Sequence, residues 1–139
     1  MKVIQHKYRK CHKARVLVGE KDFKRVLLQH GVIGLVATEG ARLTSGQLES
    51  SRRTIRKIIK KAGNVYFMVI LDRPITAKPA EVRMGKGKGS YSESVSLVKQ
   101  GTVLIELGGN SLPIKLGLKA LLITQKKLPI KTKIIFYEE

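Results

Sequence analysis

The stretch that most constrains the fold of this chain is a predicted amphipathic helix that begins at Thr44. Thr44 is followed three residues later by Gln47, the spacing at which two side chains cap a helix N-terminus reciprocally. The apolar residues that follow recur at helical spacing, so one face of the helix must pack against another layer. This stripe comprises Leu48, Ile55, Ile58, Ile59 and Ala62.

A long apolar run follows this helix almost immediately. Gly63 and Asn64 tolerate the left-handed conformation with which many helices end. Val65–Leu71 is then continuous, aromatic and β-branched, which predicts a central strand. A helix joined by a short connection to an apolar strand indicates a helix packed on a sheet.

Periodicity and turn residues predict the remaining elements. We expect a strand at Gly34–Thr38, a loop at residues 72–92, a hairpin of Val95–Val98 and Thr102–Leu107 around residues 99–101, and a last strand at Ile130–Tyr137. A second helix is expected to open at Ser111-Leu112-Pro113, because Pro suits a first helical turn. Its apolar face would present Ile114, Leu118, Leu121 and Leu122.

This order of elements predicts an α+β two-layer sandwich, with two main helices packed on a mostly antiparallel sheet. Residues 1–30 show little periodicity and many cations, so they are expected as an extended basic N-terminal arm of the same unit. Residues 31–139 are expected as a single globular domain. A long basic glycine-rich loop would interrupt it.

The charge balance restricts the partners of the chain. There are 28 Lys and Arg residues against 10 Asp and Glu, a net charge of +18, which destabilises a compact monomer unless an anion neutralises it. A phosphate polymer fits this requirement. The longest apolar run falls well short of the roughly 18–20 residues that span a membrane, so no membrane partner is expected. A lone cysteine, Cys11, and an N-terminus without a signal-peptide core indicate a reducing compartment.

The first helix carries its cations in two rows at i, i+4 spacing. Like charges at this spacing weaken an isolated helix by a few tenths of a kcal/mol per pair, and Glu49 alone relieves Arg53. The pattern therefore favours anion binding, and a merely solvated face is the alternative. The rows are Arg52, Arg56 and Lys60, and Arg53, Lys57 and Lys61.

Residues 81–89 read EVRMGKGKG and raise the question of a nucleotide site. A P-loop requires Ser or Thr after its Lys, and neither Lys86 nor Lys88 has one. The dinucleotide pattern G-x-G-x-x-G also fails, because its last position falls on Ser90 or Ser92. Glycines between lysines instead predict a basic finger that approaches phosphates closely. A solvated hairpin tip is the alternative.

The sequence gives no pattern for catalysis or metal binding. His6, Cys11 and His12 lie in the arm, His30 stands alone, and no nucleophile motif accompanies them. We expect no enzyme activity, catalytic residue, metal or cofactor.

Three basic elements on one small domain indicate insertion among several RNA segments. For the arm, a disordered tail without fixed contacts is the alternative. The expected RNA-binding residues are Lys7, Tyr8, Arg9, Lys10, Lys13, Arg15, Arg42, Arg52, Arg53, Arg56, Lys57, Lys60, Lys78, Arg83, Met84, Gly85, Lys86, Gly87, Lys88 and Gly89.

The stretch RPITAKPAEVRMGKGKGS closely resembles the characteristic segment of bacterial-type large-subunit ribosomal protein sixteen, a universal ribosomal family. KYRKCHKAR resembles the family's basic arm, ARLTSGQLESSRRTIRK its first helix and KKLPIKTKIIF its closing strand. The resemblance covers most of the chain. Residues 16–31 are hard to match, and SYSESVSLV lacks the aromatic residues usual after the loop.

The resemblance implies an architectural role on the large-subunit rRNA near the 5S rRNA. It further implies that residues 83–89 reach toward the A-site tRNA, that neighbouring large-subunit proteins surround the chain, and that one copy serves each ribosome. A Lys- and Ile-rich composition suggests an organelle-encoded mitochondrial member, with a bacterial or plastid member as the alternatives. A nucleotide-dependent enzyme and a free-standing nucleic-acid binder are the competing functions.

Overall fold

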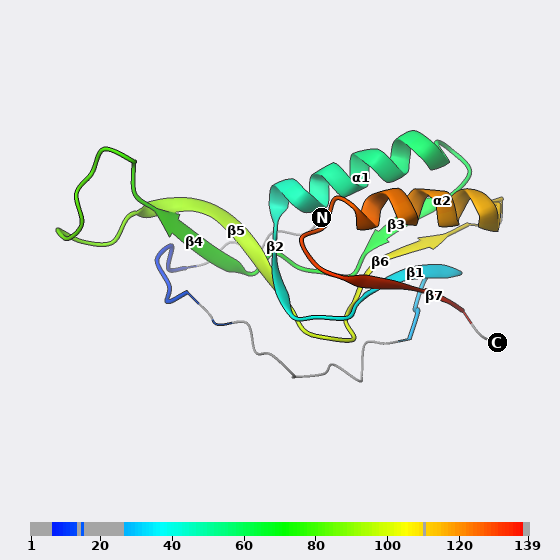
Figure 1. Cartoon of the computed structure of the whole chain (residues 1–139), viewed down its shortest axis with the longest axis horizontal. Helices are drawn as coiled ribbons and strands as arrows, with labels where there is room; N and C mark the ends of the chain where they lie inside the picture. Colours follow the sequence, from blue (N-terminus) through cyan, green and yellow to red (C-terminus); the bar gives the residue numbers. More distant parts are fainter. Residues whose placement is uncertain (1–6, 14, 16–26, 110, 138–139) are drawn as a thin grey trace.

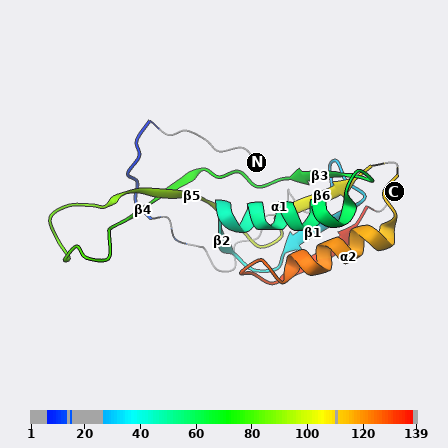
Figure 2. The same cartoon turned by 90° about the horizontal axis from the view of Figure 1, so that it is seen from above.

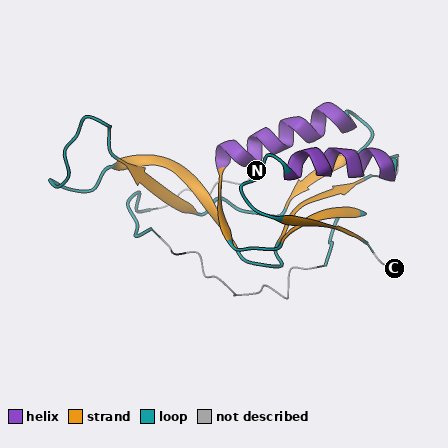
Figure 3. Ribbon diagram, in the orientation of Figure 1, coloured by secondary structure: helices purple, strands orange, loops and turns teal. Residues whose placement is uncertain are grey.

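A computed structural model describes residues 7–13, 15, 27–109 and 111–137 of the chain. Two helices, α1 (Ser45–Ile59) and α2 (Ile114–Gln125), lie side by side over one face of a sheet, as Figures 1 and 2 show. A narrow β-hairpin extends away from this body and ends in a long loop (Figure 3). The structure therefore confirms the predicted α+β class with two packed helices.

The strands form two sheets where one was predicted. The first has four strands in the order β3 (Asn64–Phe67), β6 (Val103–Gly108), β1 (Ile33–Ala37) and β7 (Thr132–Phe136). The second has three, in the order β2 (Ala41–Thr44), β5 (Ser90–Val98) and β4 (Arg73–Ala77). All five strand pairings are antiparallel.

Helix α1 begins where the sequence predicts. The Thr44 side chain accepts from the Gln47 N–H at 3.3 Å, and the Gln47 side chain accepts from the Thr44 N–H at 3.0 Å. The end of the helix was predicted wrongly. The residue that ends the helix is Lys60, whose φ of 54° and ψ of −114° lie outside the helical region, and not Gly63 or Asn64.

The main core lies between the helices and the four-stranded sheet. Leu48 and Ile55 of α1 are fully buried there together with Leu35 of β1 and Leu107 of β6. A smaller apolar cluster covers another part of the sheet, where Leu28 packs with Val36 and Val103. Burial on both faces explains why every residue of β1 is buried.

A buried carboxylate fixes the segment that carries Leu28. Glu106 of β6 has no exposed side-chain surface, and its Oε2 accepts the backbone N–H groups of Gln29, His30 and Gly31 at 3.1, 2.7 and 3.0 Å. These bonds satisfy the charge that burial would otherwise penalise. Residues 29–31 are therefore held against strand β6.

Val65–Leu71 does not form the predicted central strand. β3 ends at Phe67 and lies at the edge of its sheet, paired with β6 alone. Val69 and Leu71 lie beyond the strand and are buried by the core. The apolar run thus reflects buried side chains in an irregular connection, which periodicity cannot distinguish from a buried strand.

The predicted hairpin of residues 95–107 is also wrong. β5 and β6 belong to different sheets, because the turn between them bonds to β1. The Gly101 N–H donates to the Ala37 carbonyl at 2.8 Å, and the Ala37 N–H donates to the Thr102 carbonyl at 3.0 Å. These contacts lead the chain from one sheet into the other.

Residues 73–77, predicted as loop, form strand β4. Pro74 is tolerated because β4 is an edge strand, where a missing N–H need not break a ladder. The apolar face of α2 also differs from the prediction. Gly117, Ala120 and Leu121 are buried, whereas Ile114 and Leu122 are more than half exposed.

Candidate nucleic-acid interface

The loop at residues 78–89 joins β4 to β5 at the far end of the extended hairpin (Figures 1 and 2). Arg83 and Lys86 are exposed, and 99% of Met84 is accessible to solvent. The sequence predicted this loop, and the structure places its charges well beyond the globular body. They can therefore enter a narrow space between other molecules.

The backbone of this loop has a specific shape. Gly85, Lys86 and Gly87 have φ values of 93°, 53° and 96°, all in the left-handed region. A side chain at Gly89 would collide with the Ala77 carbonyl, so glycine is required where the two strands close. Lys78 Nζ donates to the Gly85 carbonyl at 2.5 Å, which folds the loop back on itself.

The described part of the basic arm lies against this hairpin. Lys10 Nζ donates to the Lys88 carbonyl at 3.1 Å, and Lys88 Nζ donates to the Cys11 carbonyl. Cys11, His12 and Lys13 also line a tight crevice against residues of β2, β4 and β5, including Arg42. The arm and the loop, far apart in sequence, thus form one basic surface. Lys7, Tyr8, Arg9, Lys10, Lys13 and Arg15 of the arm are all exposed.

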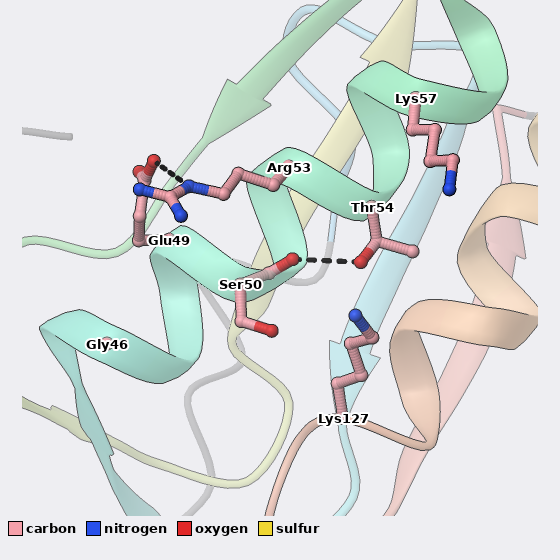
Figure 4. Close-up of a pocket in the computed structure, with 7 residues that line it drawn as sticks. All are labelled: Gly46, Glu49, Ser50, Arg53, Thr54, Lys57 and Lys127. Carbon is pink, nitrogen blue, oxygen red and sulfur yellow. Dashed lines mark hydrogen bonds and ion pairs between the residues drawn. The ribbon is translucent and has the colours of Figure 1, made fainter.

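Cations of the two rows on α1 line two separate grooves. Arg53 and Lys57 line a groove of about 490 Å³ with Ser50, Thr54 and Lys127 (Figure 4). Arg52 and Arg56 line a second groove of about 530 Å³ beside β3. The reason is geometric, because residues one apart on a helix point about 100° from each other.

Glu49 forms ion pairs at the N-terminal end of both rows. Its carboxylate accepts two hydrogen bonds from Arg52, both at 2.8 Å, and one from Arg53 Nε at 3.1 Å. These hydrogen bonds, first from Arg52 and then from Arg53, lower the pKa of Glu49 from 4.5 to about 2. Glu49 raises the pKa of Arg52 in return. Arg56 and Lys57, a turn further on, are left to attract anions.

Lys127, His30 and Tyr66 are among the groove residues that were not predicted. Lys127, after α2, lines the same groove as Arg53 and Lys57, and the only sequence signal for it was its place in the lysine pair 126–127. His30 and Tyr66 meet with ring centroids 5.3 Å apart beside Arg52 and Arg56. His30 and Tyr66 are far apart in the chain, so no sequence pattern indicated that they would be in contact.

Among the described residues, no cluster of three or more His, Cys, Asp or Glu side chains could hold a metal ion. Within that same part of the chain, no helix is long and apolar enough to cross a membrane. The chemistry that the interface offers is cationic, with hydroxyl groups and aromatic rings beside the cations, which suits a polyanion.

Comparison with known proteins decides the family. The family described as Ribosomal protein L16p/L10e matches residues 3–135. The chain belongs to the L16p/L10e family of ribosomal proteins. This result confirms the family to which the loop, the arm and the first helix pointed.

Curated L16p/L10e relatives are similar along nearly their whole length. The large ribosomal subunit protein uL16 of Gluconacetobacter diazotrophicus is 45% identical over 93% of this chain and 91% of the relative. That of Gluconobacter oxydans is 42% identical over the same shares. A uL16 protein of Cereibacter sphaeroides is 42% identical over 96% of this chain and 94% of the relative. Membership in a family of ribosomal proteins agrees with the predicted non-enzymatic role.

Proposed function

We propose that this chain is a structural constituent of the large ribosomal subunit, where it binds rRNA. The family match and the uL16 relatives support this role. The main support for RNA binding is the projecting loop at residues 78–89, which has positive φ values at residues 85–87 and exposed cations. Such a loop reaches phosphate groups that a flat surface cannot approach.

We further propose that the loop and arm contact rRNA near the 5S rRNA and help to position the A-site tRNA. The Lys10 and Lys88 contacts support this reading, because they hold the arm against the loop before RNA arrives. Preorganisation lowers the entropic cost of binding. Neighbouring large-subunit proteins would complete the site around a single copy of the chain.

The double substitution Lys86→Ala and Lys88→Ala tests the loop. We expect an intact fold, because both side chains lie outside the core, together with impaired A-site tRNA binding or late assembly of the large subunit. The measurements are circular dichroism of the purified protein, sedimentation of particles, and tRNA binding to isolated ribosomes. Lys115→Ala with Lys119→Ala, two exposed cations of α2, is the matched control.

The two possible failures are distinct. An unmodified chain that never sediments with large subunits contradicts the ribosomal role itself. A double variant that assembles normally and binds tRNA normally contradicts only the assignment of the loop.

The compartment is a separate proposal. We propose a mitochondrial ribosome, supported by the Lys- and Ile-rich composition and by the departures from the family pattern at residues 16–31 and 90–94. The relatives named above are bacterial. Detection of the chain in large subunits purified from isolated mitochondria tests this, and detection only in another compartment overturns it.

A further inference from the structure

The groove beside β3 combines cationic and aromatic side chains. Arg52 and Arg56 line it from α1, while His30 and Tyr66 line it from the sheet side. Its volume of about 530 Å³ lies within the roughly 300–1,000 Å³ typical of sites for small organic groups. We propose that this groove binds one unpaired nucleotide of RNA, with its base on the His30–Tyr66 pair and its phosphates on Arg52 and Arg56.

The aromatic pair is suited to a base. The His30 and Tyr66 rings lie 5.3 Å apart at an interplanar angle of 38°, so neither ring fully covers the face of the other. Tyr66 is half-buried and His30 exposed, which leaves ring surface open to a ligand. Unpaired bases stack on such rings in many RNA-binding proteins.

The backbone beneath the rings is already fixed. The His30 N–H donates to Glu106 Oε2 at 2.7 Å, and Tyr66 stands opposite Glu106 in the register of β3 and β6. The His30 backbone is thus bonded to the Glu106 carboxylate, and the Tyr66 backbone is paired with Glu106 in the sheet. A base would bind without first ordering the segment, which favours affinity.

The cations are placed for the sugar–phosphate backbone. Arg52 and Arg56 are one helical turn apart on α1 and both line the groove. Arg52 uses two of its donors on Glu49, and a guanidinium has five, so others remain for phosphate oxygens.

The free edge of β3 supplies base-specific hydrogen bonds. The Met68 N–H donates to the Leu104 carbonyl at 3.1 Å, and bonds alternate along an antiparallel pair. The amide groups of Val65 and Phe67 therefore point away from β6, toward the groove that these residues line. A protein strand could also use this edge, but two arginines and a histidine favour a nucleotide.

This proposal rests on the proposed RNA-binding function and is tested with purified components. The probe is an RNA hairpin with a single-nucleotide bulge of 2-aminopurine, compared with the same hairpin fully paired. The full-length protein should bind the bulged hairpin about tenfold more tightly, the scale of one base–aromatic stack. Stacking should also quench the 2-aminopurine fluorescence.

Tyr66→Ala should abolish both the preference and the quenching, whereas Tyr66→Phe should keep them. Tyr137→Ala is the matched control, since Tyr137 is 57% exposed and lies outside the groove. If Tyr66→Ala fails to fold by circular dichroism, His30→Ala takes its place, because this exposed side chain is not part of the core. Arg52→Ala with Arg56→Ala should weaken binding of both hairpins.

Equal affinity of the unmodified protein for the two hairpins overturns the proposal. The edge of β3 would then be interpreted as a site for a strand of another protein. Quenching that persists in both Tyr66→Ala and His30→Ala also overturns it. Neither result bears on particle assembly, which sedimentation measures separately. Failure of this inference is therefore distinguishable from failure of the proposed function.

Discussion

Glu106→Gln is the sharpest test of how the body holds the segment at residues 29–31. In the native protein Oε2 accepts three backbone N–H groups at 2.7 to 3.1 Å, and Oε1 lies 3.2 Å from the Gln29 nitrogen. A glutamine can place its oxygen at the Oε2 position. Its NH₂ group would then face the Gln29 N–H, donor against donor.

The magnitude follows from the change in bond type. Hydrogen bonds to a charged acceptor contribute about 1.5–3 kcal/mol and neutral ones about 0.5–1.5, so each of the three loses about 1 kcal/mol. Gln29 and His30 are exposed and can recruit water. We therefore expect a loss of about 2 kcal/mol in the free energy of unfolding.

Urea unfolding followed by circular dichroism measures this loss. With a denaturant slope of about 2 kcal/mol per M, the midpoint should fall by about 1 M. Glu81→Gln, an exposed carboxylate of the loop, is the control and should leave the midpoint within about 0.2 M. A Glu106→Gln midpoint equal to that of the control, with unchanged amide exchange at residues 29–31, would refute the reasoning.

Three further outcomes are expected. Gly89→Ala should disorder the end of the hairpin because the added Cβ meets the Ala77 carbonyl, and a native-like amide spectrum for strands β4 and β5 would contradict this. Gly46→Ala, in the open first turn of α1, should instead raise the free energy of unfolding by up to about 1 kcal/mol in urea titrations. Because the folded pKa of Glu49 is about 2 against 4.5, its ion-pair stabilisation should be complete above about pH 4.5 and be lost as the pH falls toward 2. An NMR titration of the Glu49 carboxyl group should give a midpoint near pH 2 in the native protein and a higher midpoint in Arg52→Ala. A native midpoint near pH 4.5 would exclude the pairing of Glu49 with the arginines.

Local chemistry made the start of α1 and the loop at residues 78–89 predictable. A capping box needs only two residues three apart, and Thr44 and Gln47 form it as expected. The end of α1 was missed because Lys60 adopts a positive φ, which a non-glycine residue rarely takes. Propensity alone would have assigned that conformation to Gly63.

Long-range pairing accounts for the other errors. The run at Val65–Leu71 is as apolar as a central strand, yet β3 lies at a sheet edge, and the rest of the run is a connection in which Val69 and Leu71 are buried. Likewise, the turn at residues 99–101 resembles a hairpin turn, but the Gly101 N–H and the Thr102 carbonyl bond to Ala37 of β1. A pattern in a short stretch of sequence cannot indicate which distant backbone group will accept a hydrogen bond.

The sequence by itself determined that the chain is basic, that α1 is amphipathic and that residues 81–89 form neither a P-loop nor a dinucleotide site. These properties depend on charge and local spacing, which are readable along the chain. Only the tertiary structure decided that the arm meets the loop at Lys88, that the cations of α1 face two grooves, and that His30 meets Tyr66. Those contacts join residues far apart in the chain, and the packing of two sheets and two helices brings them together.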